Sequence, residues 1–232
     1  MPITKTQKKR EPLWKEWDRL AQKKGVHHAV LTTTGDTYTG DWYDNKKNGK
    51  GNQIWRKTGA VYDGDWKDDN RHGYGVYSVM RSGILVKEYA GGWKNDKKHG
   101  YGTNYYSTDE YYEGEWYAGK RSGWGRMYYS DGSVYEGEWY NDQCHGNGLL
   151  RLANNNRFEG SWANNMKNGT GKFIFLDKGQ TLSGHWKDDI AKCGSLEDFD
   201  REHAPSPPVF PIPQCTVMNP ANVLKKAAEE LT

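Results

Sequence analysis

Two pairs of glutamates are the residues whose type and spacing most resemble a catalytic arrangement. Glu113 and Glu115, and again Glu136 and Glu138, could suggest the two carboxylates of a glycosidase. However, the two pairs lie 23 positions apart inside a longer repeated pattern, and that pattern accounts for their spacing without any chemistry. We therefore expect no catalytic residue and no enzymatic activity.

Histidines and cysteines could bind a metal, but their positions do not favour it. His72, His99 and His145 occupy the same place in different copies of the repeated pattern, and neighbouring copies are expected to lie about 9 to 10 Å apart. A zinc shell needs ligands near 2.1 Å from one ion, so these histidines cannot converge within one chain. The cysteines are scattered without paired ligand spacing, which predicts free thiols: Cys144, Cys193 and Cys215. We expect no metal site and no cofactor.

The repeated pattern is an aromatic residue, any residue, Gly, any residue and Trp, followed by Gly seven and nine positions after the Trp. One copy is Tyr112-Glu113-Gly114-Glu115-Trp116 with Gly123 and Gly125. Successive copies start 23 to 27 residues apart, at Tyr38, Tyr62, Tyr89, Tyr112, Tyr135, Phe158 and Leu182. The last copy is degenerate, because Leu182 replaces the ring and Cys193 and Ser195 replace the two Gly. A fixed period in this range is typical of a repeat protein.

Each copy predicts a pair of antiparallel strands. The first strand alternates, so that its ring, Gly and Trp share one face while the intervening residues point to the other. The second strand follows the paired Gly, whose bare Cα atoms leave room for the ring of a neighbouring strand. The predicted fold class is all-β, an elongated single-layer antiparallel β-meander of seven hairpins, roughly fifteen strands in all, with short terminal helices.

The composition agrees with a repeat and excludes several other classes. Only 34% of residues are hydrophobic and the mean hydropathy is −1.05, which is low for a conventional core, while 14% aromatic residues argue against disorder. The net charge of +3 gives little support for nucleic-acid binding. The sequence has neither a signal peptide nor a stretch apolar enough to span a membrane, so we expect a cytoplasmic protein.

Three segments are expected along the chain. Residues 1–25 form a basic segment with a short amphipathic helix, residues 26–199 hold the repeats, and residues 200–232 form a Pro-rich connector and a short C-terminal helix. The N-terminal helix is expected to cover the first edge strand, although it could instead dock a partner. The exposed sheet ends leave homo-oligomerisation open.

The copies resemble MORN repeats (membrane occupation and recognition nexus), above all the one at Tyr112–Trp116 and the next at Tyr135–Trp139. The resemblance covers about residues 26 to 199. It implies a twisted, trough-shaped antiparallel sheet that holds partners, as in adaptors of membrane contact sites, myosin tails and ciliary or flagellar structures. Some members carry an enzyme domain, which we do not expect in the 33 residues after Phe199.

The predicted binding surface is an aromatic groove on the ring-bearing face of the central copies, Tyr89 to Trp162. Aromatic-rich grooves favour extended or helical peptide segments. The candidate contact residues are Tyr101, Tyr105, Trp116, Trp124, Tyr128, Trp139 and Leu150. The alternative is that these rings only pack against one another.

The sequence thus predicts a non-enzymatic scaffold or adaptor that brings two or more protein partners together. A cytoskeletal, ciliary or flagellar, or regulatory complex would be its setting. The alternative function is a peripheral membrane module that binds anionic phospholipid, for example on a vesicle, through basic hairpin turns. The candidate residues for this basic edge are Lys97, Lys98, Lys120 and Arg121, which could equally be solvated turn residues.

Overall fold

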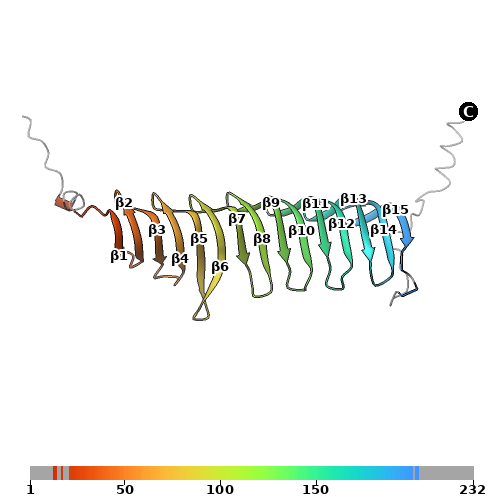
Figure 1. The fold of residues 1–232 in the computed structure, drawn as a ribbon, viewed down its shortest axis with the longest axis horizontal. Coiled ribbons are helices and arrows are strands. Elements are labelled where there is room, and N and C mark those ends of the chain that lie inside the picture. Colours follow the sequence, from red (N-terminus) through yellow and green to blue (C-terminus); the bar gives the residue numbers. More distant parts are fainter. Residues whose placement is uncertain (1–12, 15–16, 18–20, 201, 204–232) are drawn as a thin grey trace, which may run out of the picture. The chain divides into compact units, whose positions relative to one another are not determined.

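The structure, a computed structural model, describes residues 13–14, 17, 21–200 and 202–203 of the chain. The strands of this part form one antiparallel sheet, and they follow one another in the sheet in sequence order from β1 to β15 (Figure 1). Each strand pairs with its neighbours in the sequence, as expected for hairpins that repeat along a chain. The predicted all-β meander is confirmed.

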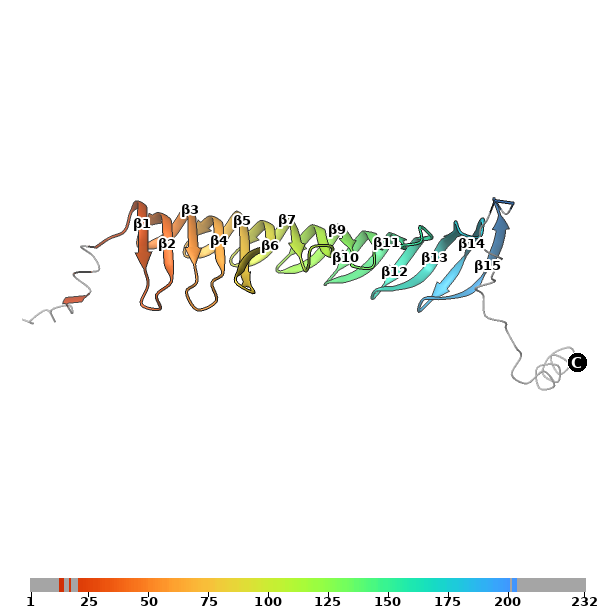
Figure 2. The same ribbon diagram turned by 90° about the horizontal axis from the view of Figure 1, so that it is seen from below.

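The chain divides into two compact units, which are described separately. The first comprises Met1–Ser130 and Trp139–Asp142, and the second comprises Asp131–Glu138 and Gln143–Thr232. The strands of the first unit are β1 (Gly25–Leu31), β2 (Thr37–Tyr43), β3 (Lys46–Ile54), β4 (Val61–Lys67), β5 (Asn70–Arg81), β6 (Ile84–Lys94), β7 (Lys97–Tyr105), β8 (Tyr111–Tyr117) and β9 (Lys120–Tyr128), which lie side by side in Figure 2. Strand β10 (Val134–Tyr140) is shared between the units, and the second unit continues with β11 (Gln143–Arg151), β12 (Arg157–Ala163), β13 (Met166–Phe175), β14 (Gln180–Lys187) and β15 (Ile190–Asp198).

The two faces of each unit differ in burial. The leading residue and the Trp of every copy are buried on one face, which we call the ring face. The intervening residues of the first strands point to the opposite face, which we call the outer face. The core of each unit therefore lies on one face of a single sheet layer.

Glycine pairs make this one-sided core possible. Gly64 on β4 is paired with Gly75 on β5, and the ring of Tyr62 lies over them. A Cβ atom at Gly75 would lie 2.3 Å from the Tyr62 hydroxyl oxygen, far inside van der Waals contact. The expectation that bare Cα atoms make room for the ring of a neighbouring strand is confirmed.

The hairpin turn within each copy is built from two residues with positive φ. Asp68 and Asp69 have φ of 47° and 67°, and Asn141 and Asp142 have φ of 49° and 71°. Two such residues form a type I′ turn, whose twist matches that of the flanking strands, and Asn and Asp adopt the left-handed region most readily among non-glycine residues. Local sequence therefore specifies where each first strand reverses.

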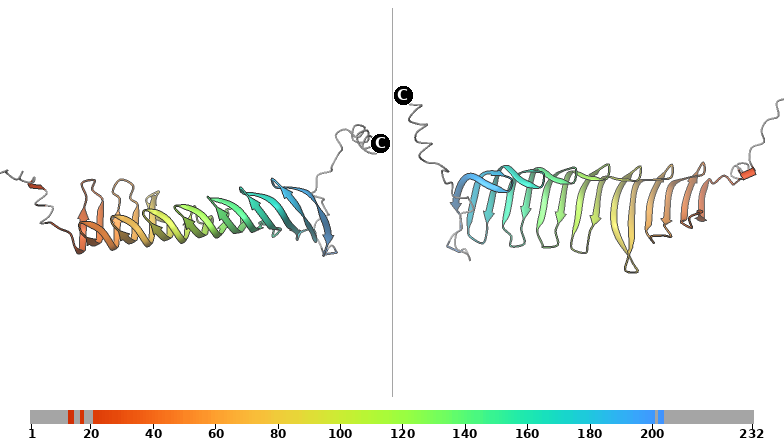
Figure 3. Two further views of the ribbon diagram at one scale, coloured as in Figure 1. Left: turned by 90° about the horizontal axis from the view of Figure 1, so that it is seen from above. Right: turned by 180° about the vertical axis from the view of Figure 1, so that it is seen from behind.

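The β5–β6 hairpin departs from the regular pattern. Its strands have 12 and 11 residues, and the hairpin projects beyond its neighbours (Figure 3, right). Met80, Ile84 and Leu85 near its tip are exposed. The longer spacing between the second and third copies in the sequence is accommodated here.

The predicted terminal helices fall almost entirely outside the described residues. Leu13, Trp14 and Trp17 are helical, in agreement with part of the N-terminal prediction. Their side chains are exposed, and the covering of the first edge strand by this helix stays a prediction. The C-terminal helix and the Pro-rich connector from residue 204 onward lie outside the described residues.

Candidate functional site

The ring face is held together by alternating tyrosine and tryptophan rings. The ring of Tyr89 is fully buried and lies 5.1 Å from Trp93 of its own copy and 5.6 Å from Trp116 of the next, both edge to face. Tyr112 repeats this arrangement, at 5.3 Å from Trp116 and 5.2 Å from Trp139. Edge-to-face contacts at such distances are the favoured geometry for aromatic pairs. Each tyrosine therefore joins two successive copies.

The backbone satisfies the polar atoms of these rings, except for the indole nitrogens of Trp42 and Trp186. The Tyr112 hydroxyl donates to the Glu115 carbonyl at 3.0 Å, and the Trp116 indole N–H donates to the Gly102 carbonyl at 3.1 Å. Burial raises the pKa of Tyr112 well above its usual value, and the nearby Arg121 opposes that shift. The buried aromatic rings are thus locked in place rather than available to a partner.

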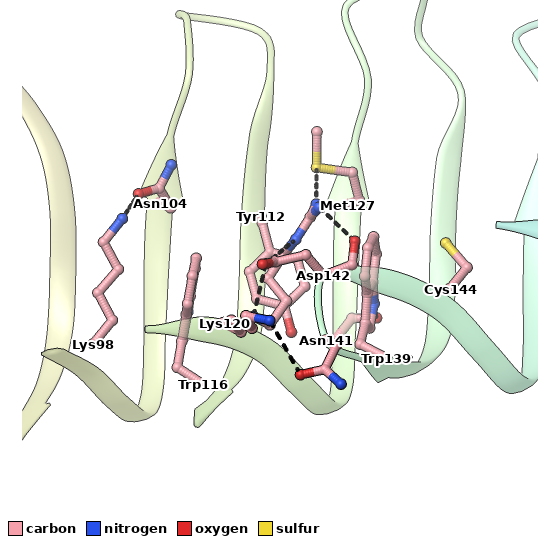
Figure 4. Close-up of polar contacts among 12 residues, drawn as sticks. Lys98, Asn104, Tyr112, Trp116, Lys120, Met127, Trp139, Asn141, Asp142 and Cys144 are labelled. Atoms are coloured by element: carbon pink, nitrogen blue, oxygen red, sulfur yellow. Dashed lines mark hydrogen bonds and ion pairs between the residues drawn. The ribbon is translucent and has the colours of Figure 1, made fainter. Parts of the chain in front are cut away.

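Basic side chains complete the ring face. The Lys98 amine lies 5.0 Å from the Tyr89 ring centre and 4.9 Å from that of Trp116 and donates to the Asn104 side-chain oxygen (Figure 4). Arg121 lies 4.3 Å from the Trp139 ring centre. Burial lowers the pKa of the Lys98 amine, which the carboxylate of Glu88 partly opposes. These cations cover the rings by cation–π contact instead of facing solvent.

The same cations connect consecutive hairpins. The Arg121 backbone N–H donates to the Asp142 carboxylate at 3.0 Å, its guanidinium reaches the same carboxylate at 3.3 Å, and the Asp142 N–H donates back to the Arg121 carbonyl at 3.0 Å. Lys47 with Asp69 and Lys167 with Asp189 repeat the backbone part of this exchange. The Asp of each of these turns is therefore a structural partner for the preceding copy.

The four residues of the predicted basic edge fall into two groups. Lys98 and Arg121 lie on the ring face as described, whereas Lys97 and Lys120 are exposed at the hairpin ends. The Lys120 amine is 3.5 Å from the Asn141 side-chain oxygen (Figure 4). The structure therefore does not bring the four charges together as one exposed surface.

The seven residues of the predicted groove also separate, because paired residues in a ladder share a face. Trp116 and Trp139 are buried on the ring face, with 5% and 4% of their surface exposed. Tyr101 and Trp124 each precede a glycine that faces a leading tyrosine, so they point to the outer face, where they are 60% and 52% exposed. The predicted single groove is corrected on this point.

The other three groove residues follow the same rule. Tyr105 and Tyr128 both pair with Tyr111, which is next to the ring-face residue Tyr112, and so they lie on the outer face. Leu150 pairs with Phe158 on the ring face of the second unit. Whether any of the seven contacts a partner remains a prediction.

On the outer face of the first unit, three tyrosines form a cluster that the groove prediction only partly included. Tyr111 stacks on Tyr128 with ring centres 4.2 Å apart, and its centre is 6.1 Å from that of Tyr105. Nearby, the Tyr101 hydroxyl donates to the Glu113 carboxylate at 2.8 Å. Burial raises the Tyr101 pKa, and this hydrogen bond adds to the effect. Sequence reasoning missed Tyr74 and Tyr111, although the alternation along each strand places both on this face.

The second unit keeps these ring contacts, with Phe158 in place of a leading Tyr and Leu182 in place of a leading ring. Phe158 contacts Trp162 and Trp186 at 5.4 and 5.1 Å, and the Lys167 amine lies 5.8 Å from the Trp186 ring centre. Cys144 is buried at the position where the other intact copies carry Lys or Arg and the degenerate copy carries Ala191. On the outer face, small polar residues such as Asn147 line a shallow hollow instead of exposed rings.

The described residues contain no group of three or more His, Cys, Asp and Glu side chains placed to hold a metal ion. In this same part of the chain, no helix is long and apolar enough to cross a membrane.

The two glutamates of the fourth copy, Glu113 and Glu115, have different surroundings. Glu113 accepts a hydrogen bond from Tyr101, whereas Glu115 lies beside Gly123.

Comparison with known protein families identifies the repeat. The model of the family described as MORN repeat matches residues 38–58, 62–78, 89–108, 112–134, 135–157 and 158–180. The chain belongs to the MORN-repeat family. Each matched MORN segment starts at the leading ring of one copy, and the matches end before the degenerate copy at Leu182.

Full-length relatives carry the same MORN repeats. A Xenopus laevis protein named MORN repeat-containing protein 3 is 55% identical over 233 residues, covering 100% of this chain and 98% of its own length. Proteins of that name from Mus musculus and Homo sapiens are 62% and 63% identical, covering 100% and 98% of this chain and 97% and 95% of their own lengths. The chain is thus similar to these relatives over its ends as well as over its MORN repeats.

Proposed function

We propose that the chain is a non-enzymatic scaffold that binds protein segments and brings two or more partners together. The observation that carries this proposal is the contrast between the two faces of the first unit. The ring-face aromatics are buried, whereas Tyr74, Tyr101 and Trp124 expose more than half of their surface on the outer face. Exposed tyrosine and tryptophan side chains on a rigid sheet are favoured anchors for protein partners.

Two separate surfaces support the bridging part of the proposal. The first is the outer face of β5 to β9, which carries the exposed aromatic residues. The second is the tip of the β5–β6 hairpin, where Met80, Ile84 and Leu85 are exposed. Apolar side chains grouped in this way on a projecting hairpin favour contact with another protein.

The charges of the hairpin ends favour protein over phospholipid. Carboxylates of the turns pair with the basic residues: Arg71 with Asp96 at 3.0 Å, Arg121 with Asp142 at 3.3 Å, and Lys167 with Asp189 at 3.3 Å. A surface whose cations are neutralised by neighbouring carboxylates attracts anionic lipid weakly, because that attraction depends on clustered basic charge. Peripheral lipid binding is therefore the second candidate.

The cellular setting and the assembly state belong to the same proposal. The family resemblance favours a cytoplasmic protein that works within a cytoskeletal, ciliary or flagellar, or regulatory complex. Self-association through the sheet ends is supported by the exposed apolar residues Val26 and Leu31 on edge strand β1.

The scaffold proposal is tested by comparing partners of the full chain with those of a Tyr101→Ala/Trp124→Ala variant. Quantitative affinity purification from cells that express the protein should show specific partners lost from the variant. Tyr117→Ala is the matched control, because Tyr117 is also an exposed outer-face residue of this unit but lies at a hairpin end. Identical partner sets for all three chains would refute the outer-face surface.

Co-sedimentation with anionic vesicles tests the lipid alternative. Charge reversal should be made at Lys97 and Lys120, because reversal at Lys98 or Arg121 would also break the ring face. We expect weak binding that these variants change little. Strong binding that Lys97→Glu/Lys120→Glu abolishes would favour the membrane module instead.

A further inference from the structure

Three exposed rings occupy the same position in consecutive copies of the first unit. Tyr74, Tyr101 and Trp124 each stand immediately before the second Gly of their copy, on β5, β7 and β9. We call these three residues the aromatic row. Neighbouring members are two strands apart, which corresponds to about 9.6 Å across a sheet. Lys50 occupies this position in the first copy and Asn147 in the fifth, so the row is limited to three copies.

This spacing matches the repeat of a polyproline II helix. Such a helix has three residues per turn and rises about 3.1 Å per residue, so every third residue recurs on one side after about 9.3 Å. A proline-rich segment running across the strands would therefore stay in register with all three rings. A β-strand repeats every two residues and an α-helix every 3.6, and neither has this period.

The surface between the first two rings lacks the side chain that other copies carry there. Most copies have a side chain at the middle of the Gly-x-Trp part of the pattern, but the third copy has Gly92, which is paired with Tyr74. A Cβ atom at Gly100, on the adjoining strand, would meet nothing within 4 Å, whereas one at Gly73 or Gly123 would meet a carboxylate side chain. A Cβ atom at Gly92 would lie 2.0 Å from the His99 carbonyl oxygen, so the surface between Tyr74 and Tyr101 is closely packed backbone without a side chain at Gly92 or Gly100. A pyrrolidine ring can lie on such a surface between two aromatic side chains.

The equivalent position between the second and third rings is acidic. Glu115 is paired with Tyr101 and is exposed. It stands two strands from Gly92, again about 9.6 Å, which is one polyproline II turn. A basic side chain three residues from the proline would therefore lie over Glu115 when the proline lies over Gly92.

We propose that the aromatic row binds a proline-rich segment of another protein in the polyproline II conformation, with Arg or Lys three residues from a proline. This inference rests on the proposed scaffold function and names the class of partner. The charge of Glu115 and the period of the rings select this occupant over an uncharged proline-rich segment, including the chain's own residues 204–213, which contain no Lys or Arg.

Fluorescence anisotropy with labelled peptides and the purified full chain tests the proposal. The probe is a proline-rich peptide of about ten residues in which Arg lies three positions from a proline. We expect it to bind more tightly than the same peptide with Arg→Glu or with that proline changed to Ala. A peptide of residues 203–213 of this chain is the third comparison.

Variants of the row should weaken binding of the Arg peptide in different ways. Trp124→Ala or Tyr101→Ala should raise the Kd about fivefold or more, as expected for an interface aromatic. Glu115→Gln should raise it about threefold at low salt and hardly at all in about 1 M salt, because an exposed charge pair is screened. Tyr117→Ala should leave the Kd unchanged, and circular dichroism should confirm that all variants are folded.

Equal affinity of the Arg, Glu and Ala peptides, or full affinity of the Trp124→Ala variant, would overturn the proposal. Tighter binding of the peptide of residues 203–213 would overturn it too and would assign the row to the chain's own tail. If affinity purification finds partners that depend on Tyr101 and Trp124 while the Arg peptide does not bind, only this inference fails. If no partner depends on those residues either, the scaffold proposal fails with it.

Discussion

Single buried tyrosines on the ring face combine packing with a specific hydrogen bond. Tyr112 contacts two tryptophans, donates to the Glu115 carbonyl at 3.0 Å and fills the space above Gly125. A Cβ atom at Gly125 would lie 2.2 Å from the Tyr112 hydroxyl oxygen. Because the hydroxyl is enclosed by backbone, its ionisation is strongly disfavoured.

This burial predicts loss of stability at alkaline pH. Burial raises the pKa of Tyr38, Tyr62, Tyr89 and Tyr112 above the usual tyrosine value of about 10. The unfolded chain therefore loses these protons above about pH 10 while the folded chain keeps them, so the free energy of unfolding falls as the pH rises further. Tyrosinate absorbance should increase in one cooperative step that coincides with the loss of sheet signal in circular dichroism.

A Tyr112→Phe variant is the control for the alkaline transition. It removes one ionisable group and should shift the transition to higher pH, while the lost hydrogen bond costs about 1 kcal/mol at neutral pH. Phe158 already occupies the equivalent position in the sixth copy, so the ring itself fits. Burial lowers the pKa of Lys47 and Lys98, so their deprotonation raises the free energy of unfolding as the pH rises, opposite to the effect of the tyrosines. Both lysines are present in the parent chain and in the variant, so their effect cancels in the comparison. An unchanged transition would contradict the assignment to tyrosine.

Among the elements, the hairpin turns depend most on local sequence. Six of the seven first strands end in turns with Asn or Asp at both positive-φ positions, and the fourth ends in Ala118 and Gly119. Ala118 has a φ of 50°, a conformation that costs alanine about 1 to 2 kcal/mol. Gly119 also lacks the side-chain acceptor that Asp142 provides to the backbone of Arg121. The turn between β8 and β9 is therefore the weakest of the series.

Asn at position 118 should relieve that strain. We expect Ala118→Asn to raise the free energy of unfolding by about 0.5 to 1 kcal/mol, because Asn adopts the left-handed region more readily than Ala. The matched control is Asn141→Ala, at the same turn position with a φ of 49°, which should destabilise by a similar amount. Urea denaturation measures both changes, and a destabilising Ala118→Asn would contradict the turn argument.

For the whole molecule, stability is organised between neighbouring copies. Each leading ring contacts the Trp of its own copy and the Trp of the next, as for Tyr62 with Trp66 and Trp93 in the first unit. Phe158 does the same in the second unit. In such an arrangement the effect of a substitution is expected to decline with distance along the repeats.

Removal of one ring-face tryptophan should therefore have a strong but local effect. Trp116→Ala removes contacts with Tyr89, Tyr112 and Lys98 and should cost about 3 to 5 kcal/mol. Hydrogen exchange should show lost protection in β6 to β9, while β12 to β14 keep theirs. Tyr117→Ala, one residue away and exposed, should change the free energy of unfolding by about 0.5 kcal/mol or less. Uniform loss of protection along the chain would contradict local coupling.

The sequence by itself determined the repeat, the antiparallel meander and the burial of the leading rings and tryptophans. These features follow from a period of 23 to 27 residues and from the alternation of Tyr112, Gly114 and Trp116, which are short-range properties. The same alternation also predicted that a side chain at one of the paired Gly would clash with the leading ring of the neighbouring strand.

Only the tertiary structure decided which side chains are available to a partner. The register shift between Gly114 and Trp116 sets two extra residues of β9 against β8, which keeps Arg121 and Gly125 on the ring face and Trp124 on the outer face, where the groove prediction did not place it. Likewise, nothing in a run of basic turn residues distinguishes Lys97 from Lys98. The first is exposed and the second lies over the rings of Tyr89 and Trp116, because the next copy folds against it. In a single-layer sheet, a side chain is buried when the neighbouring copy packs against it. The sequence pattern within one copy carries no information about that contact between copies.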